Sequence, residues 1–152
     1  MPLPTKQKVF CIGFNKTGTT SIGAALQSMG YTLGNQGEAE LLIDDWARRD
    51  FRRLLKLCET ADAFQDIPFS LPETYAALDE AFAGSKFVLT VRNNSQEWFE
   101  SLTRFHTKLI AKGRLPTATD LQACTYREPG WLWNAHRLIF GADESTVYDR
   151  SQ

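Results

Sequence analysis

The sequence has little cysteine and little histidine, with three and two of them in 152 residues. Cys11, Cys58 and Cys124 form no CxxC pair, and no pair of histidines stands near them at the spacing of metal ligands. These absences disfavour a disulfide framework and a zinc site. We therefore expect reduced, buried thiols of the kind found in cytoplasmic proteins, and a functional site without a metal.

The sequence also lacks a long hydrophobic run. No apolar stretch approaches the roughly 20 residues that a helix needs to cross a bilayer, and residues 1–8 contain no signal-peptide core. The 17 basic and 18 acidic residues leave a net charge of −1. Binding of nucleic acid through bulk positive charge needs a clear excess of basic residues. We expect a cytoplasmic protein without a membrane or nucleic-acid partner, although a local anion site needs only a few donors.

The rest of the composition is that of an ordinary globular protein, with 43% hydrophobic and 23% charged residues. A chain of 152 residues has about the length of one domain. The sequence contains no internal repeat, low-complexity tract or linker that would divide it. We expect a single domain over residues 1–152.

Three apolar runs predict the strands of a sheet. Residues 8–13 form a continuous apolar run closed by Gly13, which is typical of a strand buried on both faces. Residues 86–91 are β-branched and aromatic, and residues 61–67 form a weaker run. The spacing of apolar residues predicts helices over 21–29, 38–46, 50–58, 72–83, 94–112 and 131–140. Residues 117–128 are expected to be irregular.

Strands that alternate with helices indicate an α/β fold with an open parallel sheet flanked by helices. Only three strands are credible, and the chain stops in the polar residues 148–152. We expect a small fold of this class, or one that lacks carboxyl-terminal elements.

The segment between the first strand and the first helix has the composition of a phosphate-binding loop. A helix N-terminus offers unpaired N–H groups and a partial positive charge, Gly18 lets the backbone approach an anion, and Lys16 adds a full charge. The expected anion ligands are Asn15, Lys16, Thr17, Gly18, Thr19, Thr20 and Ser21. A plain strand–helix turn is the less favoured alternative.

The loop is P-loop NTPase-like but departs from the nucleoside-triphosphate motif in one place. That motif, GxxxxGK[ST], puts its lysine directly after the second glycine. Gly13 and Gly18 keep the spacing of the motif, but Thr19 follows Gly18 and the lysine stands at position 16. A lysine there can reach a 5′-phosphate and the atom that bridges it to its substituent, and is less suited to a β/γ-phosphate pair.

The sequence Lys-Thr-Gly-Thr-Thr-Ser at this place resembles the 5′-phosphosulfate loop of the sulfotransferases that use PAPS, 3′-phosphoadenosine 5′-phosphosulfate. A second segment resembles the 3′-phosphate motif of that family: Phe87-Val-Leu-Thr-Val-Arg92, a short loop, then Glu97-Trp-Phe-Glu-Ser101-Leu. Residues 62–91, with Asp66-Ile-Pro68, are similar to the small microbial and fungal members. The resemblance covers roughly residues 8–101.

The resemblance implies that PAPS is the co-substrate and that Arg92 and Ser101 hold its 3′-phosphate. Ser101 lies nine residues after Arg92, one more than is usual in the family, so Ser95 is an alternative. Lys16 would stabilise the charge on the leaving phosphate, and the sulfuryl group would pass to a hydroxyl or amine of a small-molecule or glycan acceptor. No metal is required.

An acceptor hydroxyl or amine needs a base. Asp66 is the first candidate because it ends the second strand beside the loop, although it is as readily explained as a cap of the turn before Pro68. His106 and His136 have a suitable intrinsic pKa, but a structural role explains both better.

A basic helix face and a tryptophan pair have ordinary structural explanations as well. Arg49, Arg52, Arg53 and Lys56 recur at helical spacing, which usually marks a solvated face and less often a surface for an anionic acceptor. The tryptophans at positions 131 and 133 favour packing over base stacking.

Two other functions stay open. One is a P-loop nucleotide kinase or NTPase with a displaced lysine, which would need Mg²⁺ and turn over ATP. The other is a catalytically idle member that binds the nucleotide without transferring sulfate. The sequence determines neither the acceptor nor the oligomeric state.

Overall fold

The computed structural model describes residues 6–110 and 113–149. The chain divides into two compact units, Met1–Val91 and Arg92–Gln152, and each is described by itself. Residues 1–5 and 150–152 lie outside the described residues. The expectations about a signal peptide and about the polar end of the chain depend partly on them. Within the described part of the chain, no helix is both long and apolar enough to span a membrane.

The first unit contains a three-stranded parallel sheet. The central strand β1 (Val9–Cys11) lies between β2 (Ala63–Gln65) and β3 (Lys86–Val88) and is parallel to both. All three predicted strands are therefore present, each shorter than its apolar run. The sheet with its helices confirms the predicted α/β class.

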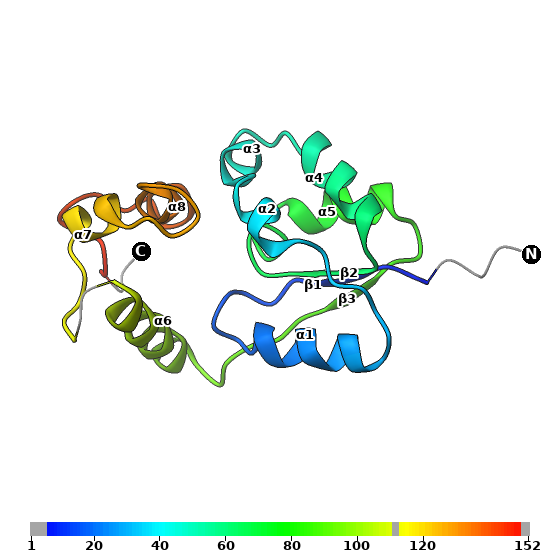
Figure 1. The fold of residues 1–152 in the computed structure, drawn as a ribbon, viewed down its shortest axis with the longest axis horizontal. Helices are drawn as coiled ribbons and strands as arrows, with labels where there is room; N and C mark the ends of the chain where they lie inside the picture. The colour runs from blue at the N-terminus through cyan, green and yellow to red at the C-terminus, as the bar shows by residue number, and fades with distance from the viewer. Residues whose placement is uncertain (1–5, 111–112, 150–152) are drawn as a thin grey trace, which may run out of the picture. The chain divides into compact units, whose positions relative to one another are not determined.

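Helices cover both faces of this sheet (Figure 1). On one face lies α1 (Thr19–Ser28), whose Leu26 packs in a cluster with residues of β1 and β2. On the other face lie α2 (Gln36–Glu40), α4 (Arg52–Leu57) and α5 (Thr74–Ala81), and α3 (Ile43–Ala47) follows α2. A short 3₁₀ turn (Cys58–Thr60) follows α4.

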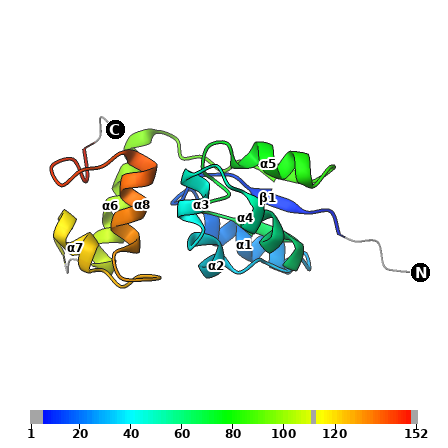
Figure 2. The ribbon, with the colours of Figure 1, turned by 90° about the horizontal axis from the view of Figure 1, so that it is seen from above.

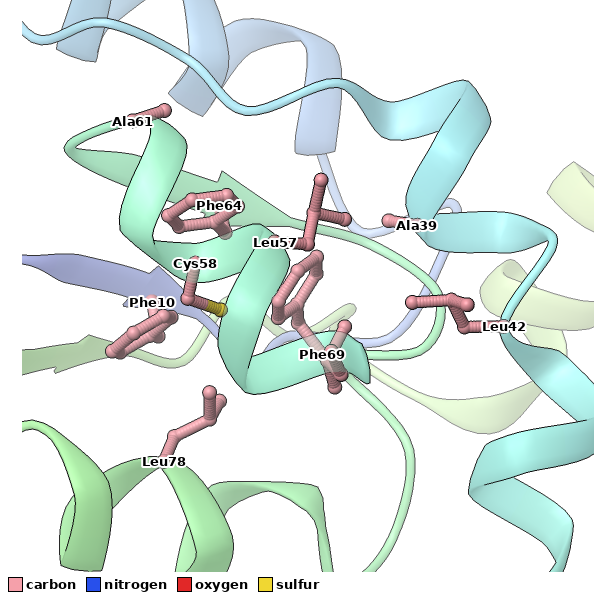
Figure 3. Close-up of a cluster of buried hydrophobic side chains, with 10 residues drawn as sticks. Phe10, Ala39, Leu42, Leu57, Cys58, Ala61, Phe64, Phe69 and Leu78 are labelled. Atoms are coloured by element: carbon pink, nitrogen blue, oxygen red, sulfur yellow. The ribbon is translucent and has the colours of Figure 1, made fainter. Parts of the chain in front are cut away.

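The core on the face of the sheet that α2, α4 and α5 cover is built around Phe10 of β1, which is fully buried (Figure 3). The centroid of its ring lies 5.8 Å from that of Phe64 and 6.3 Å from that of Phe69. Leu78 of α5 and Cys58 belong to the same buried cluster. These side chains fix the middle of the sheet, so the residues that follow the strand ends start from a rigid base.

The helix predicted over residues 38–46 is divided in two, which corrects the sequence prediction. Asn35 caps α2 by accepting a hydrogen bond from the Glu38 N–H at 3.2 Å. A turn then separates α2 from α3 and allows Leu42 and Ile43, which are neighbours in sequence, both to be buried. A continuous helix would point them about 100° apart.

The second unit is helical. Its longest helices are α6 (Ser95–Leu109) and α8 (Trp131–Phe140), which Figure 2 shows as coiled ribbons. They pack together through the rings of Trp98 and Phe140, whose centroids are 6.0 Å apart. The Asn94 side chain accepts a hydrogen bond from the Glu97 N–H at 2.9 Å and so caps the start of α6.

Part of the segment expected to be irregular, residues 117–128, is a helix. It is α7 (Ala118–Ala123), and a reciprocal capping box starts it. The Thr117 hydroxyl accepts from the Asp120 N–H at 3.3 Å, and the Asp120 carboxylate accepts from the Thr117 N–H at 2.7 Å. The prediction was wrong because so short a helix has little apolar periodicity and depends on its cap and on packing.

Candidate functional site

The candidate site lies at the carboxyl edge of the sheet. Because the three strands are parallel, their carboxyl ends meet at one edge, where α/β folds bind ligands. Residues 13–18 follow β1 at this edge, Asp66 follows β2, and Thr90 follows β3. Sequence segments more than 70 residues apart are thus brought together, as the hydrogen bond between Thr17 and Thr90 shows.

The loop after β1 bends twice through the left-handed region. Lys16 has φ of 63° and Gly18 has φ of 102°. A left-handed conformation is ordinary for glycine but carries a cost for lysine, and such strain is concentrated at ligand sites. Backbone turns of this kind can direct successive N–H groups toward one anion.

Gly13 is required at the start of the loop for a different reason. A Cβ atom there would lie 2.7 Å from the backbone nitrogen of Thr90, which is closer than real contacts allow. The loop and the end of β3 therefore touch backbone to backbone. At Gly18, by contrast, an added Cβ would have open space around it, so the space in front of α1 is accessible.

The amino terminus of α1 faces the loop with its N–H groups available. Gly18 is the N-cap residue, and within the described residues no side chain caps the helix. The first hydrogen bond of the helix runs from the Ile22 N–H to the Gly18 carbonyl at 3.0 Å. The N–H groups of Thr19, Thr20 and Ser21 precede it and have no carbonyl within the helix to bind. These groups and the helix dipole make the site suitable for a phosphate or sulfate.

Asp66 lies beside this loop. Its carboxylate accepts hydrogen bonds from the Thr19 hydroxyl and, at 2.9 Å, from the Ile67 N–H. Burial raises the pKa of the Asp66 carboxyl above its ordinary value, and the nearby Glu40 carboxylate adds to the rise. The two hydrogen bonds and the positive charge of Lys16 act in the opposite direction. The structure thus brings together the two residues predicted to be catalytic, Lys16 and Asp66.

The remaining predicted loop residues differ in their exposure to solvent. Asn15 and Thr17 are partly buried, whereas Thr20 and Ser21 are exposed on the first turn of α1. The hydroxyl of Thr17 donates to the Phe14 carbonyl and also forms a hydrogen bond with the hydroxyl of Thr90, which follows β3. It supports the loop, while the exposed hydroxyls are free in orientation to meet a ligand.

A family model described as a sulfotransferase domain matches residues 8–151. The chain belongs to this family. The match extends through both units and well beyond residue 101, where the resemblance in the motifs ended. No curated protein matches the chain in sequence.

In this sulfotransferase-domain protein, the residues predicted to hold the 3′-phosphate belong to the second unit. The Arg92 guanidinium donates to the Ser101 hydroxyl over 3.4 Å, so their polar atoms converge despite the extra residue between them. Ser95 lies elsewhere, on the wall of a cavity of about 160 Å³ between α6, α8 and the residues that follow α8. The predicted ligands thus form two groups, one in each unit.

The two histidines considered as bases lie inside the second unit. Both are only 4% exposed, and their ring centroids are 5.4 Å apart. Nδ1 of His106 lies 2.8 Å from the Tyr148 hydroxyl. Burial lowers the pKa of His136 to about 4, although a hydrogen bond with the Val147 backbone acts in the opposite direction and raises it. Such burial and contacts are typical of core residues, and they agree with the structural role that the sequence favoured for both histidines.

Three arginines of α4 and of the segment before it, Arg48, Arg52 and Arg53, are paired with acidic residues. Asp45 is bound by Arg48 at 2.5 Å and by Arg53 at 3.0 Å, and Arg52 binds Asp50 at 2.6 Å. The guanidinium of Arg49 lies over the Trp46 ring at 4.9 Å. This surface is therefore a network of ion pairs around the helix.

Sequence reasoning missed three residues of the site: Thr90, Gln36 and Glu40. Thr90 gave no signal because its contact with the loop is long-range. Glu40 gave no clear signal either, because acidic residues are common on exposed helix faces and its burial depends on where α2 packs.

Proposed function

We propose that this protein transfers the sulfuryl group of PAPS to a hydroxyl or amine of a small-molecule or glycan acceptor. The observation that carries the proposal is the grouping of Lys16, the uncapped start of α1 and Asp66 at one edge of the sheet. The membership in the sulfotransferase-domain family supports it. The donor site has the chemistry that a 5′-phosphosulfate needs: backbone donors, hydroxyls and one cationic amine.

The reaction is an in-line displacement at sulfur. The bond between sulfur and the oxygen that bridges it to the 5′-phosphate breaks, and its electron pair stays on the phosphate to give 3′-phosphoadenosine 5′-phosphate. A new bond forms between sulfur and the acceptor oxygen or nitrogen. Lys16 stabilises the charge that grows on the leaving phosphate, and the N–H groups of Thr19 and Thr20 bind the non-bridging oxygens.

Asp66 takes the proton that the acceptor loses. Its carboxylate has about four lone-pair positions, and the bonds from Thr19 and Ile67 occupy two of them. Burial, which raises its pKa, makes it a stronger proton acceptor than an exposed aspartate. The same hydrogen bonds hold it in a fixed orientation beside the donor loop.

The 3′-phosphate would be held by Arg92 and Ser101. A guanidinium and a hydroxyl 3.4 Å apart can both donate to one phosphate, and the fork of arginine suits its geometry. The position of Ser95 on the cavity wall favours Ser101 for this role.

The kinase or NTPase alternative requires a lysine where Thr19 stands. The hydroxyl of Thr19 instead donates to Asp66, and the only lysine of the loop, Lys16, comes before Gly18. This arrangement favours a 5′-phosphosulfate over a triphosphate.

A cytoplasmic location is part of the proposal. Burial raises the pKa of Cys11 to about 11 and that of Cys58 to about 12, so both thiols stay protonated and unreactive. Reduced thiols of this kind are typical of proteins that fold in the cytoplasm.

Calorimetric titration with 3′-phosphoadenosine 5′-phosphate and with ATP, each with and without Mg²⁺, tests the function. We expect the first ligand to bind without Mg²⁺ and Lys16→Ala to weaken it roughly tenfold or more, because a bond to a charged group is lost. Lys56→Ala, an exposed lysine on α4, is the matched control and should bind as the wild type does.

Two results would contradict the proposal. Preference for ATP with Mg²⁺ would assign the protein to the nucleotide kinases or NTPases. Tight binding of 3′-phosphoadenosine 5′-phosphate without any cleavage of PAPS, tested against a panel of phenols, sugars and amines, would identify an idle binding protein.

A further inference from the structure

A second carboxylate, Glu40, is buried next to Asp66. It is the last residue of α2, and it is only 6% exposed. Removing a carboxylate from water is costly, and glutamate is almost never buried without a partner. An apolar side chain would serve the packing of α2 better, so the acidic group calls for a functional explanation.

A chain of hydrogen bonds joins Glu40 to Asp66. The Gln36 side-chain amide donates to the Glu40 carboxylate at 3.2 Å and to the Ile67 carbonyl at 2.9 Å. The N–H of the same Ile67 donates to the Asp66 carboxylate at 2.9 Å. One end of α2 is thus fastened to the turn that carries Asp66, and the two carboxylates are linked through Gln36 and one residue of backbone.

The charges around Asp66 come from two elements. Glu40 faces it from α2, and Lys16 faces it from the loop after β1, while Thr19 and Ile67 contribute uncharged donors. A like charge disfavours the ionised form of Asp66, and an opposite charge favours it. Burial is the largest cause of the raised pKa of Asp66, and the like charge of Glu40 adds to it, while the opposite charge of Lys16 lowers the pKa only slightly.

We propose that Glu40 is a positioning residue that orients Asp66 through Gln36 and Ile67 and places a second carboxylate beside it. The inference rests on the proposed function, since it concerns how Asp66 takes the proton of the acceptor. It also predicts that the site disfavours anionic acceptor groups, because two carboxylates stand beside the loop.

The test compares Glu40→Gln with Glu38→Gln, which removes an exposed carboxylate from the same helix. The ionisation of Asp66 is followed by carbon-13 NMR of its carboxyl, and the cleavage of PAPS is followed against pH with water or a simple phenol as the acceptor. In Glu40→Gln we expect Asp66 to titrate at a lower pH than in the wild type. The acid limb of the rate should move in the same direction, and Glu38→Gln should change neither.

A conservative variant separates positioning from folding. Glu40→Asp retains the charge and should keep the Asp66 titration close to that of the wild type, even if the rate falls. In an Asp66→Asn background, Glu40→Gln should no longer move the acid limb. If Glu40→Gln does not fold, Gln36→Leu breaks the same connection, and the rate should fall with binding of 3′-phosphoadenosine 5′-phosphate unchanged.

The outcomes distinguish the two proposals. An Asp66 titration that is the same in Glu40→Gln and wild type overturns the role of Glu40, whether or not PAPS is cleaved. A shifted titration in a protein that never cleaves PAPS supports the coupling of the two carboxylates and refutes the sulfotransferase activity.

Discussion

The hydroxyls of Thr17 and Thr90 lie 2.8 Å apart and connect the anion loop to the residues that follow β3. Thr17 stands in the middle of the loop, and Thr90 stands two residues before Arg92. The same two segments meet at Gly13, where the backbone of Thr90 leaves no room for a side chain. The loop is therefore held by its neighbouring strand as well as by the strand from which it emerges.

Replacing Thr90 with valine should weaken the binding of 3′-phosphoadenosine 5′-phosphate. The variant keeps the branched shape and removes one hydrogen bond, worth about 1 kcal/mol or roughly fivefold in affinity. Calorimetry measures the effect. Thr32→Val is the control and should bind normally, because this exposed threonine lies beside the first residue of β2, away from the loop. Equal affinities for all three proteins would show that the loop does not need the brace.

Alanine and asparagine should act oppositely at the two glycines of the loop. Gly18 has open space and a left-handed φ, which asparagine tolerates better than alanine, so Gly18→Asn should be the more stable variant there. At Gly13 any Cβ meets the Thr90 backbone, so the larger Gly13→Asn should lose more than the about 1–3 kcal/mol expected for Gly13→Ala. Urea unfolding gives both free energies. The same order at both sites would contradict the assigned causes.

Arg92→Lys should reduce the preference for 3′-phosphoadenosine 5′-phosphate over AMP by roughly tenfold, because lysine cannot form the two parallel bonds of arginine. Arg104→Lys on α6 is the control, since this arginine is also exposed. Ser101→Ala should reduce the preference less, and Ser95→Ala should leave it unchanged. A loss with Ser95→Ala instead would transfer the role to Ser95, and an equal loss for both nucleotides would remove Arg92 from the 3′-phosphate.

Stability should fall as the pH drops from about 6.5 toward about 4, because burial lowers the pKa of His136 to about 4. Between these values the unfolded chain binds a proton at this histidine and the folded chain does not, so protons favour unfolding. Above pH 6.5 the His136 side chain is neutral in both the folded and the unfolded chain, so its contribution to stability is fully present. The free energy of unfolding should fall by about 3 kcal/mol over this range.

Urea unfolding at a series of pH values measures this dependence. His136→Gln should have a flatter profile than the wild type, whereas Arg137→Gln, its exposed neighbour, should keep the slope. An unchanged slope in His136→Gln would place the origin of the pH dependence at another group.

The first strand, its loop and α1 could be predicted from the sequence because their signals are local. A buried run, a glycine-rich turn and apolar spacing over a helix all lie within 8–30. The division between α2 and α3 could not, since three successive apolar residues fit a helix as well as a turn, and only packing selects the turn. Lys16 and Asp66 are 50 positions apart in the sequence, and only the fold brings them together.

The contacts that complete the site were even harder to predict from the sequence. The burial of Glu40 depends on the place where α2 meets the turn after β2, and the brace from Thr90 depends on the order of the strands. Neither is encoded by spacing or composition. Arg92 and Ser101 were found through a resemblance, and nothing in the periodicity of α6 distinguishes Ser101 from other partly buried polar residues.

The ion pairs of Asp45 and Asp50 have a consequence for the choice of acceptor. Arg48 and Arg53 share one buried carboxylate, and Arg52 is matched by its own. A heavily sulfated or phosphorylated polymer reaching this surface would compete with internal counter-ions, and its attraction would be correspondingly weak. Selection among acceptors then depends on the shape and hydrogen bonding of uncharged groups, so added salt should alter it little.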